Sequence, residues 1–170
     1  MQANRLFDPQ TLRLAVFVAV AGLMGFGYYL QYVEGLEPCP LCITQRFFLV
    51  LTGCLGLAAA VHRPGKTGAM VYGLLGAGSA LAGSGFSMRQ LYLQGLPPDQ
   101  APACGPSIDF IFSTFPLTEA LSILLRGDGN CAEVAWEFLG LSIPGWTLIA
   151  FWGLATVWIA QIWLSRKQSA

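Results

Sequence analysis

Two cysteines separated by two residues, Cys39 and Cys42, are the strongest candidates for chemistry in this chain. A pair at this spacing closes a small ring, which suits a disulfide that opens and recloses in thiol–disulfide exchange. A ring this small constrains little of the chain and therefore adds little stability. The spacing predicts a redox-active dithiol rather than a structural bridge.

Arg46 follows four residues after Cys42, so on a helix the two side chains lie one turn apart on the same face. Cys42 stands at the predicted start of an apolar helix, where free backbone N–H groups and the helix dipole favour a thiolate. The permanent charge of Arg46 then acts on that thiolate or on a bound acceptor. An arginine below the membrane interface usually marks function; the alternative is a side chain that reaches back to the lipid head groups.

Cys104 and Cys131 form a second pair, separated by 26 residues. A purely structural disulfide is one possible role for this pair, since closing a loop of this length stabilises the folded protein by about 3–4 kcal/mol. A zinc site with four thiolates usually draws on two close pairs. A c-type haem needs a histidine directly after the second cysteine of the motif, where this chain has Ile43. The pattern therefore predicts no metal site.

The composition places these cysteines in a membrane protein. Of the 170 residues, 55% are hydrophobic and only 11% are charged, which is too few ionisable groups to solvate an ordinary globular surface. The net charge is zero and no basic cluster exists, so nucleic acid is excluded as a partner. We expect a single membrane domain over residues 1–170, with the lipid bilayer as its surroundings.

Four apolar segments are long enough to cross a bilayer as helices, which takes about 20 residues. The predicted spans are residues 12–30, 43–61, 67–88 and 146–164. The first is interpreted as an uncleaved span rather than a signal peptide, because no small-residue cleavage site follows it. The third is dense in small residues that let helices approach closely, at Gly73/Ala77, Gly76/Ala80 and Ala80/Ser84. The pattern predicts an all-α membrane protein, a four-transmembrane-helix bundle.

Both cysteine pairs fall in loops on one side of the membrane, over residues 31–42 and 89–145. Basic residues near the span ends gather on the opposite side, with the termini: Arg5, Arg13, Arg63, Lys66, Arg166 and Lys167. By the positive-inside rule both termini are cytoplasmic, and both loops face the periplasm or an equivalent oxidising space, where disulfides persist. In the second loop, leucines at helical spacing over residues 116–126 predict a short amphipathic helix on the membrane surface.

At these residues the sequence resembles the DsbB family of inner-membrane disulfide-forming enzymes. The resemblance covers nearly the whole chain and rests on Pro38-Cys39-Pro40-Leu41-Cys42 with Gln45-Arg46, on Leu93-Gln94 and Leu96-Pro97 ahead of Cys104-Gly105-Pro106, and on Cys131-Ala132-Glu133 leading to Trp136 and Phe138-Leu139-Gly140-Leu141. It implies a multi-pass protein of the bacterial inner (cytoplasmic) membrane. Such a protein reoxidises a periplasmic, DsbA-like thioredoxin-fold protein and passes the electrons to the membrane quinone pool, ubiquinone or menaquinone.

The resemblance also implies a role for each site residue. Reduced DsbA would attack Cys104 of a Cys104–Cys131 disulfide, and Cys131 would then exchange with Cys39. Cys42 would be left as the thiolate that faces quinone, with Arg46 beside the quinone ring.

Some members of the family carry a histidine before the third cysteine, whereas residues 93–96 of this chain contain none. Arg89 and Gln90 are the nearest polar side chains. Two other functions stay open from the residues alone. A non-catalytic four-helix scaffold or adhesion protein would use its loop disulfides for structure only. A thiol oxidoreductase of the vitamin K epoxide reductase type would share the four helices, but the second cysteine pair on a long loop favours a protein thiol as substrate.

Overall fold

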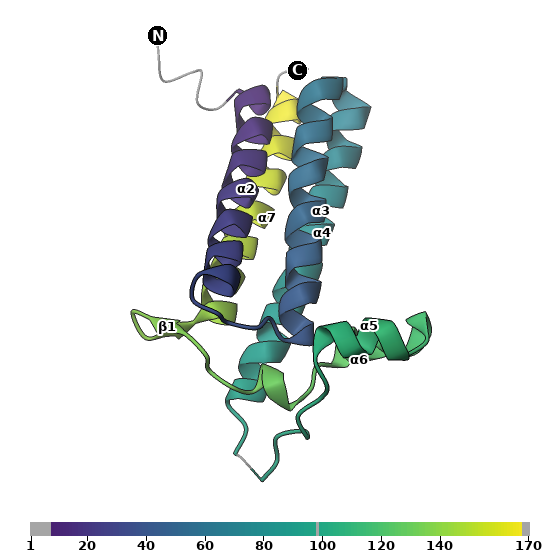
Figure 1. The fold of residues 1–170 in the computed structure, drawn as a ribbon. Helices are drawn as coiled ribbons and strands as arrows, with labels where there is room; N and C mark the ends of the chain where they lie inside the picture. Colours follow the sequence, from purple (N-terminus) through teal and green to yellow (C-terminus); the bar gives the residue numbers. More distant parts are fainter. Residues whose placement is uncertain (1–7, 98, 168–170) are drawn as a thin grey trace.

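Four long helices form the body of the molecule. The computed structural model describes residues 8–97 and 99–167. The helices are α2 (Pro9–Tyr32), α3 (Pro40–His62), α4 (Lys66–Gln94) and α7 (Ile143–Lys167), and they stand side by side as a bundle (Figure 1). Each is long and apolar enough to cross a membrane. The prediction of an all-α four-helix membrane bundle is confirmed.

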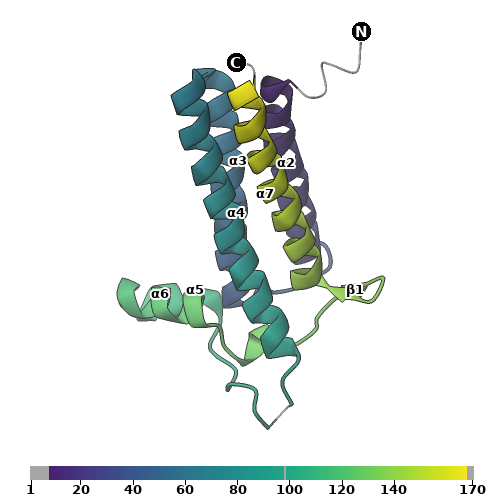
Figure 2. The same ribbon diagram turned by 180° about the vertical axis from the view of Figure 1, so that it is seen from behind.

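The two ends of the bundle differ. Helix α2 begins and α7 ends at the end where α3 connects to α4, as Figures 1 and 2 show. The α2–α3 connection and the long α4–α7 connection lie at the opposite end, which we call the loop end. Cys39, Cys104 and Cys131 therefore belong to connections at the loop end of the bundle, and Cys42 lies in α3 at the same end.

Proline residues set the start of α3 at the loop end. Pro40 is the first residue of the helix and Cys39 is its N-cap, with an extended backbone. Proline suits the first helical turn because its fixed φ matches the helix and its missing N–H would be unpaired there. Cys42 consequently lies in the first turn of α3, with Cys39 just outside it.

Helix α4 continues to Gln94, six residues beyond the predicted apolar segment, which ended at residue 88. Polar residues interrupt the apolar pattern there but do not end the helix, which stops at Gly95. The extension carries Gln90 at the loop end of the bundle.

Helices α4 and α7 pack closely because glycines of α4 leave room for large side chains of α7. Phe151 and Trp158 are fully buried. A Cβ atom at Gly76 would overlap the indole of Trp158, and a Cβ atom at Gly83 would overlap the ring of Phe151. The small residues of the third span thus accommodate aromatic side chains at this interface.

We expect Gly76→Ala to lower the free energy of unfolding by about 1–3 kcal/mol, because the added methyl group overpacks the contact with Trp158. Gly78 of the same helix is the matched control, since it is exposed and a Cβ atom there would meet nothing within 4 Å. Denaturant unfolding of both variants in detergent measures the difference. Equal stability of Gly76→Ala and Gly78→Ala would contradict the packing described here.

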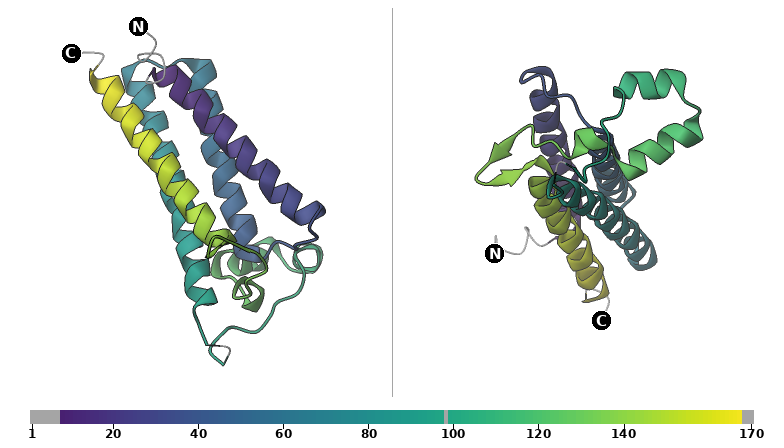
Figure 3. Two further views of the ribbon diagram at one scale, coloured as in Figure 1. Left: turned by 90° about the vertical axis from the view of Figure 1, so that its left-hand side faces the viewer. Right: turned by 90° about the horizontal axis from the view of Figure 1, so that it is seen from below.

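Smaller elements extend sideways at the loop end (Figure 3). They are α5 (Ile108–Thr114), α6 (Leu117–Arg126), the 3₁₀ helix η1 (Gly129–Cys131) and an antiparallel hairpin of β1 (Glu137–Phe138) and β2 (Leu141–Ser142). Helix α6 lies where the sequence predicts an amphipathic helix, and its position on the membrane surface stays a prediction. Helix α5 and the hairpin were not predicted.

Candidate active site

Three of the four predicted redox cysteines come together at the loop end. Cys39 and Cys131 are buried in one apolar cluster with Leu41, and Cys42 packs against that cluster. The sulfurs of Cys39 and Cys42 are 2.9 Å apart, at hydrogen-bonding distance. All cysteines of the chain are free thiols. In this arrangement Cys39 can form a disulfide either with Cys42 or with Cys131.

The turn that carries Cys131 is built from short-range hydrogen bonds and one glycine. The N–H of Cys131 donates to the carbonyl of Asp128 at 3.0 Å, and the Asp128 carboxylate accepts from the N–H of Asn130 at 3.0 Å. Gly127 has a positive φ of 75°, and a Cβ atom there would come within 2.7 Å of Leu41. The glycine therefore lets η1 approach the start of α3 closely.

Cys104 is exposed, unlike Cys131. The segment around it is joined to η1 by two hydrogen bonds, from the N–H of Gly129 to the carbonyl of Ala103 at 3.0 Å and from the side chain of Asn130 to the carbonyl of Gly105 at 3.1 Å. The chain thus holds an exposed thiol, accessible to another protein, beside the turn that ends in the buried Cys131.

Hydrogen bonding among the thiols separates their acidities. The pKa of Cys39 is raised well above the ordinary thiol range, first by its hydrogen bond with Cys131, then by that with Cys42, and by burial. The pKa of Cys131 is lowered, chiefly because Cys39 donates a hydrogen bond to it. Of this pair Cys131 is therefore the thiol that loses its proton first, with Cys39 as its hydrogen-bond donor.

A variant that keeps only Cys39 and Cys131 as thiols should titrate in two separate steps. As the pH rises, Cys131 ionises first, below the ordinary thiol range, and Cys39 ionises only well above it. The ultraviolet absorbance of the thiolate measures both steps. A matched variant that also carries Cys39→Ala should ionise Cys131 at higher pH because its donor is gone; an unchanged first step would contradict the hydrogen bond.

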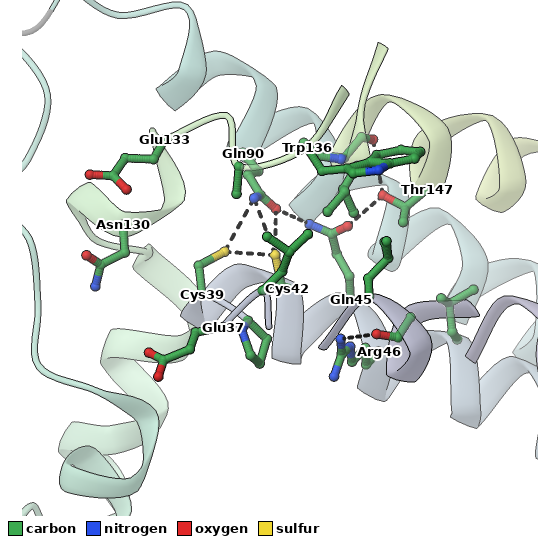
Figure 4. Close-up of a pocket in the computed structure, with 18 of the residues that line it drawn as sticks. Glu37, Cys39, Cys42, Gln45, Arg46, Gln90, Asn130, Glu133, Trp136 and Thr147 are labelled. Carbon is green, nitrogen blue, oxygen red and sulfur yellow. Dashed lines mark hydrogen bonds between the residues drawn. The ribbon is translucent and has the colours of Figure 1, made fainter. Parts of the chain in front are cut away.

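The side chain of Gln90 faces the thiols of both Cys39 and Cys42 (Figure 4). Its side chain is only 3% exposed, and its amide nitrogen donates to the sulfur of Cys39 at 3.3 Å and to that of Cys42 at 3.4 Å. Its carbonyl accepts from the amide of Gln45 at 2.7 Å. The Gln45 carbonyl in turn accepts from the hydroxyl of Thr147 at 2.6 Å. This chain of bonds orients the N–H groups of Gln90 toward the sulfurs.

Arg46 lies one turn beyond Cys42 and contacts α2. Its guanidinium donates to the Gln31 side chain and, at 3.0 Å, to the carbonyl of Gly27, and it lies 5.4 Å from the ring centre of Tyr28. Cys42 and Arg46 nevertheless line the same cavity, of about 120 Å³. Gln45 and Gln90 also line it, so this cavity brings together a thiol, a cation and two amides.

A second, apolar cavity of about 370 Å³ adjoins the first, with which it shares Leu23, Leu30 and Trp136 in its lining. It extends between α2 and α7, along Phe26 and Ile149, whose side chains are about half exposed. The two cavities together form a pocket that has amide and guanidinium groups beside the thiols and continues into an apolar groove on the side of the bundle. Their lining suits a molecule with a polar ring and a lipid tail.

Comparison with known proteins shows the family of the chain. The family model described as "Disulfide bond formation protein DsbB" matches residues 9–161. The chain belongs to the DsbB family. It is 54% identical to Disulfide bond formation protein B of Hahella chejuensis over 159 residues, which are 94% of this chain and 96% of the relative. The protein of the same name from Saccharophagus degradans is 48% identical over 161 residues, or 95% and 97% of the two chains.

In this DsbB-family chain the predicted site residues do not all lie together. Cys39, Cys42 and Arg46 line the first cavity, and Cys131 is buried in the same apolar cluster as Cys39. Cys104 is exposed on the surface. From the sequence, Gln90 was only a polar residue near the predicted site, and Gln45 and Thr147 had no predicted role. The available sequence signal for Gln90 was an amide side chain two residues beyond the end of an apolar segment.

Proposed function

We propose that the chain is a membrane thiol oxidoreductase that reoxidises the dithiol of a DsbA-like periplasmic protein and passes the electrons to a membrane quinone. The observation that carries the proposal is the shared cavity of Cys42 and Arg46, which continues into the apolar groove between α2 and α7. The relatives' name, disulfide bond formation protein B, supports the thiol half of the reaction.

The order of exchange follows from exposure. Cys104 is the exposed thiol, so in a Cys104–Cys131 disulfide its sulfur is the one that a reduced protein attacks. Cys131 leaves as a thiolate, which the backbone hydrogen bonds of Leu41 and Asp128 to its sulfur favour. Cys131 then attacks the sulfur of Cys39 in a Cys39–Cys42 disulfide, and Cys42 leaves as the thiolate in the cavity. The second substrate thiol displaces Cys104, and the substrate becomes a disulfide. Cys104 then attacks Cys131 in the Cys39–Cys131 disulfide, which re-forms the Cys104–Cys131 bond and releases Cys39. The two electrons and two protons of the substrate are then held by Cys39 and Cys42.

The cavity residues fit a quinone at the thiolate end. Arg46 and the amide groups of Gln45 and Gln90 supply a positive charge and hydrogen-bond donors beside Cys42, and the groove offers apolar walls for an isoprenoid tail. A bound quinone supplies an acceptor for two electrons and two protons. The chain's part is to hold the sulfur of Cys42 at the polar end of this space and to keep lipid-soluble molecules within reach of it.

The proposal places the chain in the bacterial inner membrane with both termini in the cytoplasm. Arg63 and Lys66 lie at the α3–α4 connection, at the same end of the bundle as the start of α2. Basic residues favour the cytoplasmic side. The loop end with its four cysteines then faces the periplasm, where substrate proteins are oxidised.

The direct test uses purified protein, a reduced DsbA-like protein and a short-chain quinone in detergent. We expect the quinone absorbance to fall in step with the loss of substrate thiols, one quinone for each disulfide formed. Exchange of thiols without any quinone reduction would overturn the proposed acceptor. A protein that neither exchanges thiols nor reduces quinone would favour the non-catalytic scaffold.

Arg46→Ala should weaken quinone use more than thiol exchange at Cys104. The arginine lines the cavity with Cys42, whereas Cys104 is on the exposed connection. Loss of its charge should raise the KM for quinone roughly tenfold, the scale of one charged hydrogen bond. Steady-state kinetics with quinone as the varied substrate, beside single-turnover exchange with reduced substrate protein, separates the two effects. Equal losses at both steps would refute a quinone-facing role.

A further inference from the structure

The tip of the β1–β2 hairpin carries an unusual leucine. The strands pair Glu137 with Ser142 and Phe138 with Leu141, so Leu139 and Gly140 form a two-residue turn. Both have positive φ, 53° and 79°, as in a type I′ turn, which favours asparagine and glycine. A leucine is strained in this conformation, and the side chain of Leu139 is 78% exposed. The hairpin therefore presents a large apolar side chain at a position that disfavours it.

The hairpin lies where a membrane span begins. Strand β2 leads directly into α7, which starts at Ile143. Helix α7 has 25 residues, a length of about 38 Å against a hydrocarbon core of about 30 Å, so its first turns fall in the interfacial region. Figure 1 shows the hairpin projecting sideways from the loop end, on the side opposite α5 and α6. Its tip thus points along the expected membrane surface, away from the bundle.

Aromatic rings connect the hairpin to the lipid-facing surface of the bundle. Ring centres are 5.9 Å apart for Phe26 and Trp136, 6.0 Å for Trp136 and Phe138, and 6.1 Å for Phe138 and Trp146. The indole N–H of Trp146 donates to the carbonyl of Phe138 at 3.1 Å. Phe26 lies on α2 and Trp146 on α7, so this row of rings joins the hairpin to both helices that border the apolar groove. Tryptophan is the residue type enriched at membrane interfaces.

We propose that the β1–β2 hairpin is a membrane anchor whose partner is the lipid interface, with Leu139 and Phe138 inserted among head groups and upper acyl chains. Phe138 is 53% exposed and continues the apolar surface that Phe26 and Ile149 present along the groove. Insertion accounts for the leucine at a turn position that favours asparagine or glycine. It also keeps the opening of the groove at the level of the lipid, which would serve the proposed quinone reaction.

The first test maps lipid contacts on the full-length protein in phosphatidylcholine–phosphatidylglycerol nanodiscs. The probe is a phospholipid with a diazirine on the upper part of one acyl chain, activated by light and located by peptide mass spectrometry. We expect label on Phe138 and Leu139, and protection of both from hydroxyl radicals in the water. Radical oxidation of the hairpin without lipid label, while α2 and α7 are labelled, would overturn the proposal.

Leu139→Asn is the decisive variant because it removes the apolar side chain while creating Asn-Gly, a favoured type I′ turn. The hairpin should therefore stay folded, and lipid labelling of Phe138 should fall about fivefold while its oxidation rises. Leu139→Phe is the matched control, since it keeps an apolar side chain at the same strained position and should label like the natural protein. Similar labelling of the two variants would contradict the anchor. The readout needs no turnover, so it is independent of whether the chain reduces quinone.

Discussion

Replacing Cys42 by serine should abolish quinone reduction while thiol exchange at Cys104 continues. In the proposed path Cys42 is the thiol released into the cavity, and a serine hydroxyl cannot form the disulfide with Cys39. Removal of a nucleophile that forms a covalent intermediate costs several orders of magnitude, and we expect a loss of at least about 10³-fold in quinone turnover. Stopped-flow measurement of quinone absorbance with reduced substrate protein tests this directly.

The control for Cys42→Ser lies in the same helix. Cys54 is a free thiol on the exposed side of α3, far from the cavity lining, so Cys54→Ser should retain full turnover. Cys42→Ser should still form a mixed disulfide between substrate and Cys104, visible on a non-reducing gel. Full quinone turnover by Cys42→Ser would show that the proposed electron path is wrong.

The spans were predictable from sequence because apolar length and helical spacing are local properties. Arg46 shares a cavity with Cys42 for the same reason, since Arg46 is the fourth residue after Cys42 on one helix. The contact of Cys131 with Cys39 is a tertiary contact and could not be predicted from local patterns. It depends on the positive φ of Gly127 and on the close approach of η1 to Leu41, and neither follows from spacing along the chain.

No role could be predicted for Gln90 because the apolar pattern of α4 ends before the helix does. The prediction ended the third span at residue 88, and the following polar residues were interpreted as the start of a loop. In the structure the helix runs on to Gln94, and the extra turns bring Gln90 against α3. The hydrogen bond from Gln45, itself in the first turns of α3, is a tertiary contact that no local pattern indicates.

Replacing Gln90 by leucine should slow electron transfer from Cys42 by roughly 10- to 100-fold. The variant removes the N–H groups that donate to the sulfurs of Cys39 and Cys42. Because Gln90 is only 3% exposed, water cannot readily replace these donors. A hydrogen bond to a charged group contributes about 1.5–3 kcal/mol, and a buried thiolate without a donor loses that stabilisation. Single-turnover quinone reduction by fully reduced protein isolates this step.

A control variant and a second assay distinguish a direct effect of Gln90 on the sulfurs from a general effect on folding. Gln94→Leu is the matched control, because Gln94 lies one turn further along α4 and lines the same cavity, but its amide bonds to the carbonyl of Glu133 at 3.4 Å rather than to a sulfur. It should slow the quinone step far less than Gln90→Leu does, because neither sulfur loses a hydrogen-bond donor. Gln90→Leu should also leave mixed-disulfide formation at Cys104 intact, because that thiol is exposed on a separate segment. If both steps slowed equally, or if Gln94→Leu matched Gln90→Leu, the amide would be part of the packing and not of the electron path.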